Sequence, residues 1–251
     1  MTDGHGLDDE LVPEPAAGRR FTTERRVRWG DADRFGRLRL DAVARYLQDT
    51  ANDDTRDTGE DPSAPWVVRR TRIDLDRPPR TGEVIALTTF AGGLGSRWAE
   101  RRTSIRSVAA DRRVEATSLW VRMDPKTGRP ARLDDRFLSL YAEAAGGRTV
   151  GSRLRHAGPL DDAESRPWPL RSTDHDALGH VNNAATWAAV EDELDRLGLV
   201  PARAELEYRD ALSPDDRVEL RSVVDGADVL RVWLCVGGRV RASAVVRAVA
   251  R

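Results

Sequence analysis

The sequence contains very little cysteine and very little lysine. Cys235 is the single cysteine among 251 residues, so an internal disulfide is impossible and a reducing compartment is expected. Lys126 is the only lysine among 41 basic residues, which we attribute to coding bias rather than to function. The formal net charge is −1, and this balance does not favour wholesale binding to nucleic acid or to a membrane surface.

Long apolar runs are also missing. Residues 1–20 lack the apolar stretch that a secretory signal requires, and no other segment approaches the length of a membrane span. The composition, 39% hydrophobic and 33% charged, is typical of a polar globular protein with a substantial core. We therefore expect a cytoplasmic protein with no nucleic-acid or membrane partner.

The segment 174–183 carries the candidate chemistry, because it gathers two aspartates, two of the four histidines and two asparagines. Residues 168–171 before it have the pattern of a short strand. The apolar residues after it repeat at helical spacing: Trp187, Val190, Leu194 and Leu197. Asn182 or Asn183 is a natural N-cap for a helix over residues 182–197. The polar residues are thus predicted to lie at a helix N-terminus, where free backbone N–H groups stabilise negative charge.

The same pattern occurs earlier in the chain. Three residues of it recur with a separation of 143: Asp31, Asp33 and Gly36 match Asp174, Asp176 and Gly179. Each copy precedes a predicted helix, over 38–58 and 182–197. Strand-like alternation is found in these ranges: 21–29, 66–76, 83–90, 96–107, 113–123, 203–209, 217–224, 230–236 and 240–249. We predict an α+β protein of two helix-wrapped antiparallel sheets related by a pseudo-twofold axis.

The repeat also predicts where the parts of the chain begin and end. Residues 1–20 are acidic, contain Gly and Pro, and are expected to form a disordered tail. The first domain is predicted over 21–145, with a short helix at 136–145 as its last element. A linker over 146–165 then leads to a second domain over 166–251 that holds the candidate motif.

Several segments together are similar to one known family. The first half contains L-Q-D-T-A at 47–51, W-V-V-R-R at 66–70 and D-R-P-P at 76–79. The second half contains D-x-x-G-H-V-N-N at 176–183 and L-E-Y-R at 206–209. The chain resembles the fatty acyl-acyl carrier protein thioesterases, of the bacterial type, whose fold is a tandem double hotdog. The resemblance implies hydrolysis of a fatty acyl thioester on acyl carrier protein to a free fatty acid, with no cofactor.

The resemblance also implies roles for residues of the second copy. Asp176 falls on the family's catalytic aspartate, as a general base or nucleophile, and His180 falls on its histidine. Backbone N–H groups around Gly179 and the helix start would form the oxyanion hole, with Asn182 and Asn183 in support. Three positions depart from the plant enzymes, where an asparagine, a glutamate and a cysteine are replaced by Leu178, Ala211 and Leu212. What remains resembles the aspartate-centred site of single hotdog thioesterases.

Other interpretations of the motif stay open. Asp176 could close a turn, His180 could pack in the core and Asn182 could simply cap the helix. A metal site is conceivable from Asp174, His175, Asp176 and His180, although we expect none. A hydratase would place its histidine five residues after the aspartate instead of four, and the G-x-S-x-G elbow of serine hydrolases is absent. An acyl-CoA thioesterase and a non-catalytic acyl-binding hotdog protein remain alternatives.

The first copy has lost most of the reactive groups. Its histidine position holds Arg37, and its two asparagine positions hold Arg39 and Leu40, so we expect one working site. Five arginines stand against two aspartates between residues 66 and 80. Arg69 and Arg70 in this stretch are expected to attract the acidic carrier protein, unless they simply form a solvated strand face. The sequence leaves open whether the protein is a monomer or a homodimer.

Overall fold

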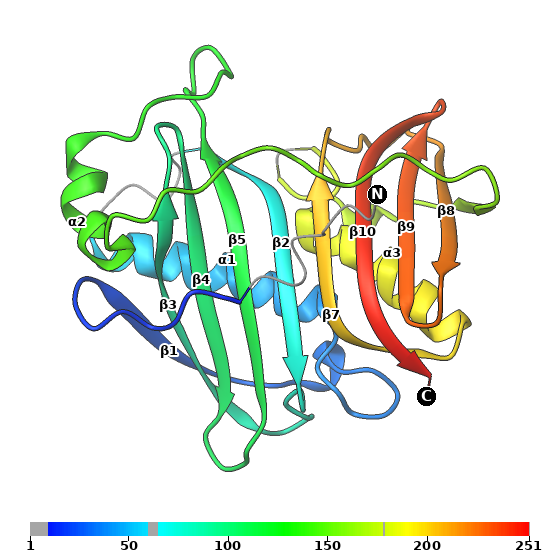
Figure 1. Cartoon of the computed structure of the whole chain (residues 1–251), viewed down its shortest axis with the longest axis horizontal. Coiled ribbons are helices and arrows are strands. Elements are labelled where there is room, and N and C mark those ends of the chain that lie inside the picture. The colour runs from blue at the N-terminus through cyan, green and yellow to red at the C-terminus, as the bar shows by residue number, and fades with distance from the viewer. Residues whose placement is uncertain (1–9, 60–64, 178, 251) are drawn as a thin grey trace.

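The computed structural model describes residues 10–59, 65–177 and 179–250. Over these residues the chain forms one antiparallel sheet of ten strands in the order β1-β3-β4-β5-β2-β7-β10-β9-β8-β6 (Figure 1). The first half contributes β1 (Arg20–Arg26), α1 (Leu40–Asp57), β2 (Trp66–Asp76), β3 (Val84–Leu94), β4 (Trp98–Ser107), β5 (Arg113–Arg122) and α2 (Asp135–Ala145). The second half contributes β6 (Glu164–Trp168), α3 (Asn183–Arg196), β7 (Leu199–Tyr208), β8 (Val218–Asp225), β9 (Val229–Val236) and β10 (Arg239–Ala250).

The two halves have the same topology. Read outward from the middle of the sheet, the order is β2, β5, β4, β3, β1 on one side and β7, β10, β9, β8, β6 on the other. This confirms the predicted repeat and the double-hotdog fold. The two predicted sheets join into one, because β2 and β7 pair edge to edge from Arg70↔Glu207 to Asp74↔Arg203. Pairing these strands leaves neither half with a free central edge.

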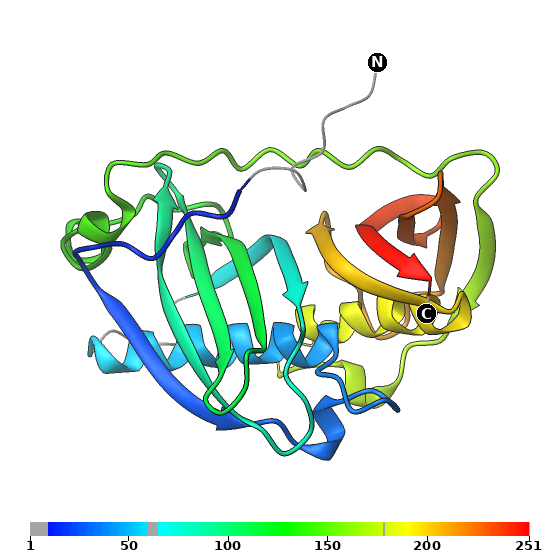
Figure 2. The same ribbon diagram turned by 60° about the horizontal axis from the view of Figure 1, so that its bottom comes forward.

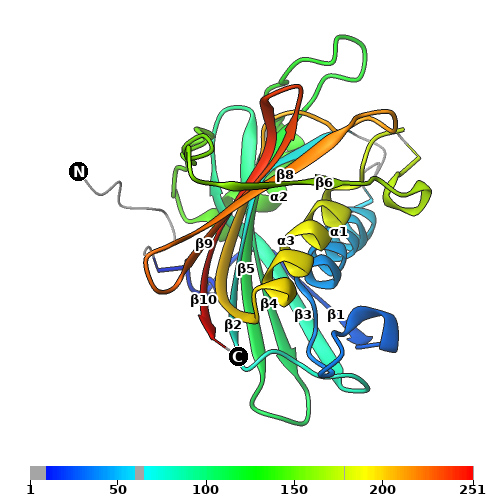
Figure 3. The same ribbon diagram turned by 90° about the vertical axis from the view of Figure 1, so that its right-hand side faces the viewer.

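The two long helices lie side by side on one face of this sheet (Figure 3). Their apolar positions are buried as the helical spacing predicts, including Leu40, Val43, Trp187 and Val190. They belong to a single cluster that also takes in strand residues of both halves. Each fully buried large side chain contributes about 1.5–3 kcal/mol, so the halves stabilise one another through a shared core.

Helix α2 packs apart from this shared core. Asp134 caps it by accepting a hydrogen bond from the Phe137 backbone N–H at 2.8 Å. Phe137 and Tyr141 then pack with Phe90 of β3 in a second buried cluster. The helix therefore closes the end of the first half that lies farthest from β7 (Figure 1).

Residues before β1 and between α2 and β6 both contact the sheet. Part of the predicted tail, residues 10–20, contacts the rest of the chain: Arg102 Nε donates to the Val12 carbonyl at 3.0 Å, and Arg19 pairs with Asp54 of α1 at 2.7 Å. Residues 1–9 lie outside the described residues. The segment after α2 crosses the face of the sheet opposite α1 and α3 (Figure 2). No helix in the described part of the chain is both long and apolar enough to cross a membrane.

One strand differs in position from its prediction. The second half begins with β6 at Glu164–Trp168, whereas the sequence predicted a strand at 168–171. β6 pairs with β8 from Glu164↔Ser222 to Trp168↔Val218. β6 is an edge strand, which can hold Pro167 within its ladder, and Pro169 follows its last paired residue.

Candidate active site

The segment 174–183 folds into a tight loop that leads into α3. The Asp176 backbone N–H donates to the His180 carbonyl at 2.9 Å, and the Gly179 N–H donates to the Asp176 carbonyl at 3.0 Å. Gly179 has a φ of +76°, a left-handed conformation that glycine adopts without a Cβ penalty. Asp176 and His180 are therefore held on the two arms of one turn. Leu178 lies outside the described residues.

Hydrogen bonds on both sides anchor this loop. The Val181 N–H donates to the Leu212 carbonyl at 2.9 Å, and the Asn182 N–H donates to the Asp174 carbonyl at 2.8 Å. The Asp174 carboxylate is buried and accepts from the Arg171 backbone N–H and guanidinium, each at 2.8–2.9 Å at closest. Asp174 therefore serves the loop's structure.

The two asparagines lie at the start of α3. Asn182 is the N-cap, because its Oδ1 accepts from the Ala184 N–H at 2.9 Å. Asn183 is the first helical residue, and its carbonyl accepts from the Tyr208 hydroxyl at 3.0 Å. The capping interpretation accounts for the Asn182 carboxamide oxygen.

The aspartate and the histidine of the motif differ from core residues in their exposure. His180 is exposed, so it is not packed in the core, and Asp176 is half-buried. Both precede the first turn of α3, whose leading N–H groups have no intrahelical acceptor. The site thus combines a partly desolvated carboxylate, an accessible imidazole and the positive end of a helix dipole.

The first copy repeats this backbone almost bond for bond. The Asp33 N–H donates to the Arg37 carbonyl at 2.8 Å, and the Gly36 N–H donates to the Asp33 carbonyl at 2.9 Å. Gly36 has a φ of +77°, which matches Gly179. The Arg39 N–H donates to the Asp31 carbonyl at 3.0 Å, as Asn182 does to Asp174.

The side chains of the first copy are engaged with one another. Arg37 Nε and Nη2 both lie 2.8 Å from Asp33 Oδ2, and two backbone N–H groups donate to Oδ1. Partial burial works in the opposite direction, but the hydrogen bonds and charge of Arg37 hold the pKa of Asp33 below its ordinary value. Asp33 is thus an ion-paired structural carboxylate.

Two cavities lie along α1. A small one of about 10 Å³ is lined by Asn183, Ala184, Gln48, Tyr208 and Trp120 among others. A larger one of about 80 Å³ lies in the first half, against the following turns of α1 at Ala51 and Thr55. Trp120 lines both, so the two cavities follow one another from the start of α3 into the first half.

Arg69 and Arg70 do not form an exposed basic rim. Arg69 Nη1 donates to the Arg209 carbonyl at 2.9 Å. The Arg70 side chain is 13% exposed, and its Nε lies 3.8 Å from Glu205 Oε2. Both are partly buried, so this placement offers little of the free positive charge that the sequence suggested for carrier binding.

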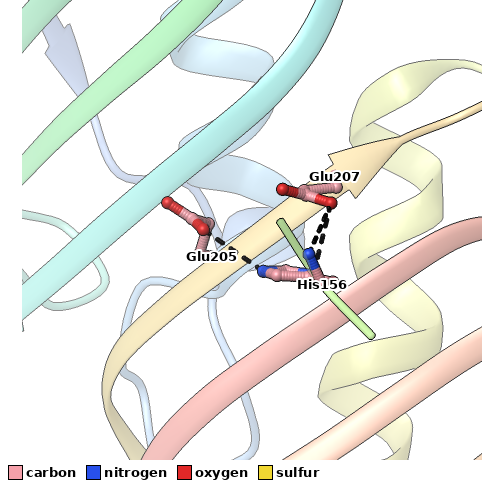
Figure 4. Close-up of side chains that lie close together, drawn as sticks. All are labelled: His156, Glu205 and Glu207. Carbon is pink, nitrogen blue, oxygen red and sulfur yellow. Dashed lines mark hydrogen bonds and ion pairs between the residues drawn. The ribbon is translucent and has the colours of Figure 1, made fainter. Parts of the chain in front are cut away.

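The described residues contain one group with metal-ligand spacing, and it lies away from the motif. His156, Glu205 and Glu207 come together where the segment after α2 crosses β7 (Figure 4). Backbone N–H groups of residues 155 and 156 donate to Glu207 at 2.5 and 3.1 Å, and Arg209 lies 3.5 Å from it. With His156 Nε2 at 3.2 Å from Glu205, the group fastens this segment to the sheet.

Gln48 and Glu191, which lie on α1 and α3, were not predicted as site residues. Glu191 Oε1 accepts from the Leu40 N–H at 2.5 Å, at the start of α1. A polar residue on a helix looks like any solvent-facing position. The separation of 143 residues that relates the motifs also relates 48 to 191, and this signal would have linked them.

Comparisons with known proteins agree with the fold. A family model described as the acyl-ACP thioesterase N-terminal domain matches residues 18–141. Two uncharacterized proteins of Mycobacterium tuberculosis are 32% identical to this chain over 250 residues, covering 98% of it and 99% of each relative.

Solved structures of low sequence identity share the architecture. A putative oleoyl thioesterase from Lactobacillus plantarum has a TM-score of 0.78 at 20% identity, covering 94% of this chain and 98% of its own. A 12:0-ACP thioesterase from Umbellularia californica has a TM-score of 0.76 at 20% identity, covering 92% and 98%. An acyl-ACP thioesterase from Bacteroides thetaiotaomicron has a TM-score of 0.76 at 18% identity, covering 91% and 97%. These likenesses establish the double-hotdog fold over nearly the whole chain.

Proposed function

The chain belongs to the acyl-ACP thioesterase family, and on this premise we propose that it hydrolyses fatty acyl thioesters of acyl carrier protein to free fatty acid and carrier protein. The observation that carries the proposal is the turn at 176–180. It sets a half-buried carboxylate and an exposed imidazole at the N-terminus of α3. A carboxylate that can act as a base, close to helix N–H groups that can stabilise an oxyanion, supports this proposal.

In the proposed reaction Asp176 accepts a proton from a water molecule, whose oxygen attacks the thioester carbonyl carbon. The resulting oxyanion lies against the N-terminal N–H groups of α3, and each such donor contributes about 3 kcal/mol in comparable sites. His180 donates a hydrogen bond to the thioester carbonyl. Collapse of the intermediate breaks the C–S bond, and the proton passes from Asp176 to the leaving thiolate.

The acyl chain is proposed to follow α1 into the first half. The cavity of about 80 Å³ in the first half is lined by Trp66, Trp120 and Phe137, with Arg101 and Arg122 also on its wall. Aromatic and aliphatic walls of this kind suit an alkyl chain. The second half would thus supply the reacting groups and the first half the chain-binding wall.

An acyl-CoA thioesterase is the second candidate, favoured by the partial burial of Arg69 and Arg70. Turnover of matched acyl-ACP and acyl-CoA thioesters over a range of chain lengths tests both, with Asp176→Asn as the inactive reference. Preference for the carrier substrate supports the proposal, and preference for CoA supports the alternative. Acyl binding without turnover of either substrate would make the protein a non-catalytic binder.

A further inference from the structure

Helices α1 and α3 each present a side chain to the start of the other helix. The clearest case is Glu191 of α3, whose Oε1 accepts from the backbone N–H of Leu40, the first residue of α1. The N-cap residue of α1, Arg39, provides no side-chain capping hydrogen bond. The helices therefore cross antiparallel, with the third turn of α3 against the N-terminus of α1 (Figure 3).

The pseudo-twofold axis places Gln48 in the matching position at the other end of the crossing. Adding 143 converts Leu40 to Asn183 and Gln48 to Glu191. Gln48 and Asn183 line the same cavity of about 10 Å³. A cavity of this volume is about the size of a single water molecule. Glu191 is hydrogen-bonded to the start of α1. At the matching position, Gln48 instead borders a water-sized cavity at the start of α3.

The polar lining of this cavity can hold a water. The Thr71 and Ser118 hydroxyls lie 3.2 Å apart on neighbouring strands and both border it. The Tyr208 hydroxyl, which donates to the Asn183 carbonyl, borders it as well. A buried water needs two to four polar partners, and these groups with Gln48 meet that number.

Glu191 shows how a carboxyl group behaves at the position that matches Gln48. Burial, followed by the charges of Asp41 and Asp33, raises the pKa of Glu191 to about 7. Asp33 and Glu191 also line one cavity in the first copy, and the separation of 143 places Asp176 and Gln48 at the matching positions of the second copy. A carboxamide at 48 carries no charge, so it can approach a working carboxylate without repelling it.

We propose that Gln48, a residue of the first half, holds the attacking water against Asp176 in the second half. This inference rests on the proposed hydrolysis at Asp176. Gln48 Oε1 accepts one hydrogen of the water and Asp176 accepts the other, which directs an oxygen lone pair at the thioester carbonyl carbon. Asp176 takes the proton as the C–O bond forms, and the proton leaves with the thiolate as the C–S bond breaks. The site is complete only when both halves are present.

Two substitutions at Gln48 and one at its symmetry mate test the proposal. Gln48→Ala should lower kcat by roughly 10- to 100-fold, the effect of losing one hydrogen bond to a reacting group, with a smaller change in KM. Gln48→Glu should add a pH dependence near neutrality, because a neutral acid imitates the carboxamide and a carboxylate repels the oxyanion. Its kcat relative to the parent protein should therefore fall as pH rises from 6 to 8. Glu191→Gln, at the matched position, should add no such dependence.

The controls separate this inference from the proposed function. If the parent protein hydrolyses thioesters and Asp176→Asn does not, the function stands. A folded Gln48→Ala with unchanged kcat, together with a Gln48→Glu profile parallel to that of the parent, would then overturn the role of Gln48 alone. If the parent protein hydrolyses no thioester, the proposed function fails first. Should Gln48→Ala unfold, the nearly isosteric Gln48→Glu still decides through its pH profile.

Discussion

The loops at 31–40 and 174–183 share a backbone and differ in chemistry. In both, an aspartate N–H bonds a carbonyl four residues on, and a glycine at φ +76° or +77° closes the turn. The first loop then pairs Asp33 with Arg37, whereas the second has a half-buried Asp176 and an exposed His180 at the matching positions. The two copies therefore share their main-chain hydrogen bonds and differ in a few side chains, on which the proposed difference in reactivity depends.

The two ends of the helix crossing also differ in their side chains. At one end the carboxyl group of Glu191 accepts a hydrogen bond from the start of α1, and at the other the carboxamide Gln48 borders a water-sized cavity. In the first copy ion pairs also join Arg39 to Asp41 at 2.7 Å. These contacts of the first copy stabilise the helix crossing. Gln48 of the first half faces the copy that we propose to be active.

The strongest test of this contrast is the aspartate in each copy. Asp176→Asn should lower kcat by roughly 10³-fold or more, because the base is removed, while acyl binding and the melting temperature change little. Asp33→Asn, the matched variant, should lower kcat less than about tenfold, since Asp33 is ion-paired away from the reaction. The hydrolysis rates of both variants are measured at equal concentrations of folded protein. If both folded variants lowered kcat equally, the site would have been assigned to the wrong half.

The residue four positions after each aspartate is expected to have the next largest effect. His180→Ala should lower kcat by roughly 10²-fold, within the usual range for a positioned polar group. Arg37→Ala should leave kcat within a few-fold and reduce stability by about 1 kcal/mol, as it leaves Asp33 without its partner. Steady-state kinetics and urea unfolding of both variants check this. A His180→Ala variant with unchanged kcat would remove the imidazole from the mechanism.

The two turn glycines should separate stability from activity. Gly36→Ala and Gly179→Ala place a side chain at nearly the same positive φ, so each should cost about 1–2 kcal/mol of unfolding free energy. Gly179→Ala should also lower kcat about tenfold, because a small displacement of Asp176 misaligns the attacking group. Gly36→Ala should not. If both changed kcat equally in folded protein, the effect would come from the shared fold.

Local patterns in the sequence were enough to predict most of the elements. Strand β2 occupies Trp66–Asp76 as predicted, since its ends are marked by turn residues. The joining of the halves was not predictable in this way, because β2 carries the same alternation whether or not β7 lies beside it. Strand β6 was misplaced for a similar reason, since pairing with β8 sets its limits.

The site shows the same division between local and long-range information. The cap formed by Asn182 and the turn at Gly179 follow from residues near in sequence. The burial of Arg70 does not follow from residues near in sequence. Its partner Glu205 also bonds His156, which lies in a segment about fifty residues away. Gln48 reaches the start of α3 only through the crossing of two helices. Local sequence patterns therefore did not predict the contacts between the two halves.

The smallest expected effect is a pH-dependent difference in stability between the copies. Because the pKa of Asp33 is held below its ordinary value in the folded protein, its contribution is present above the unfolded pKa, near 4. It is lost as pH falls through the lower folded pKa. Urea unfolding of Asp33→Asn should thus show a deficit of up to about 1 kcal/mol at pH 7 that narrows below pH 4, since a largely screened pair contributes no more. The position that matches Arg37 in the second copy holds His180, so the ion pair between Asp33 and Arg37 is not repeated at these positions. A deficit at Asp33 that stayed constant down to pH 3 would mean that packing, and not the ion pair with Arg37, gives this aspartate its stabilising role.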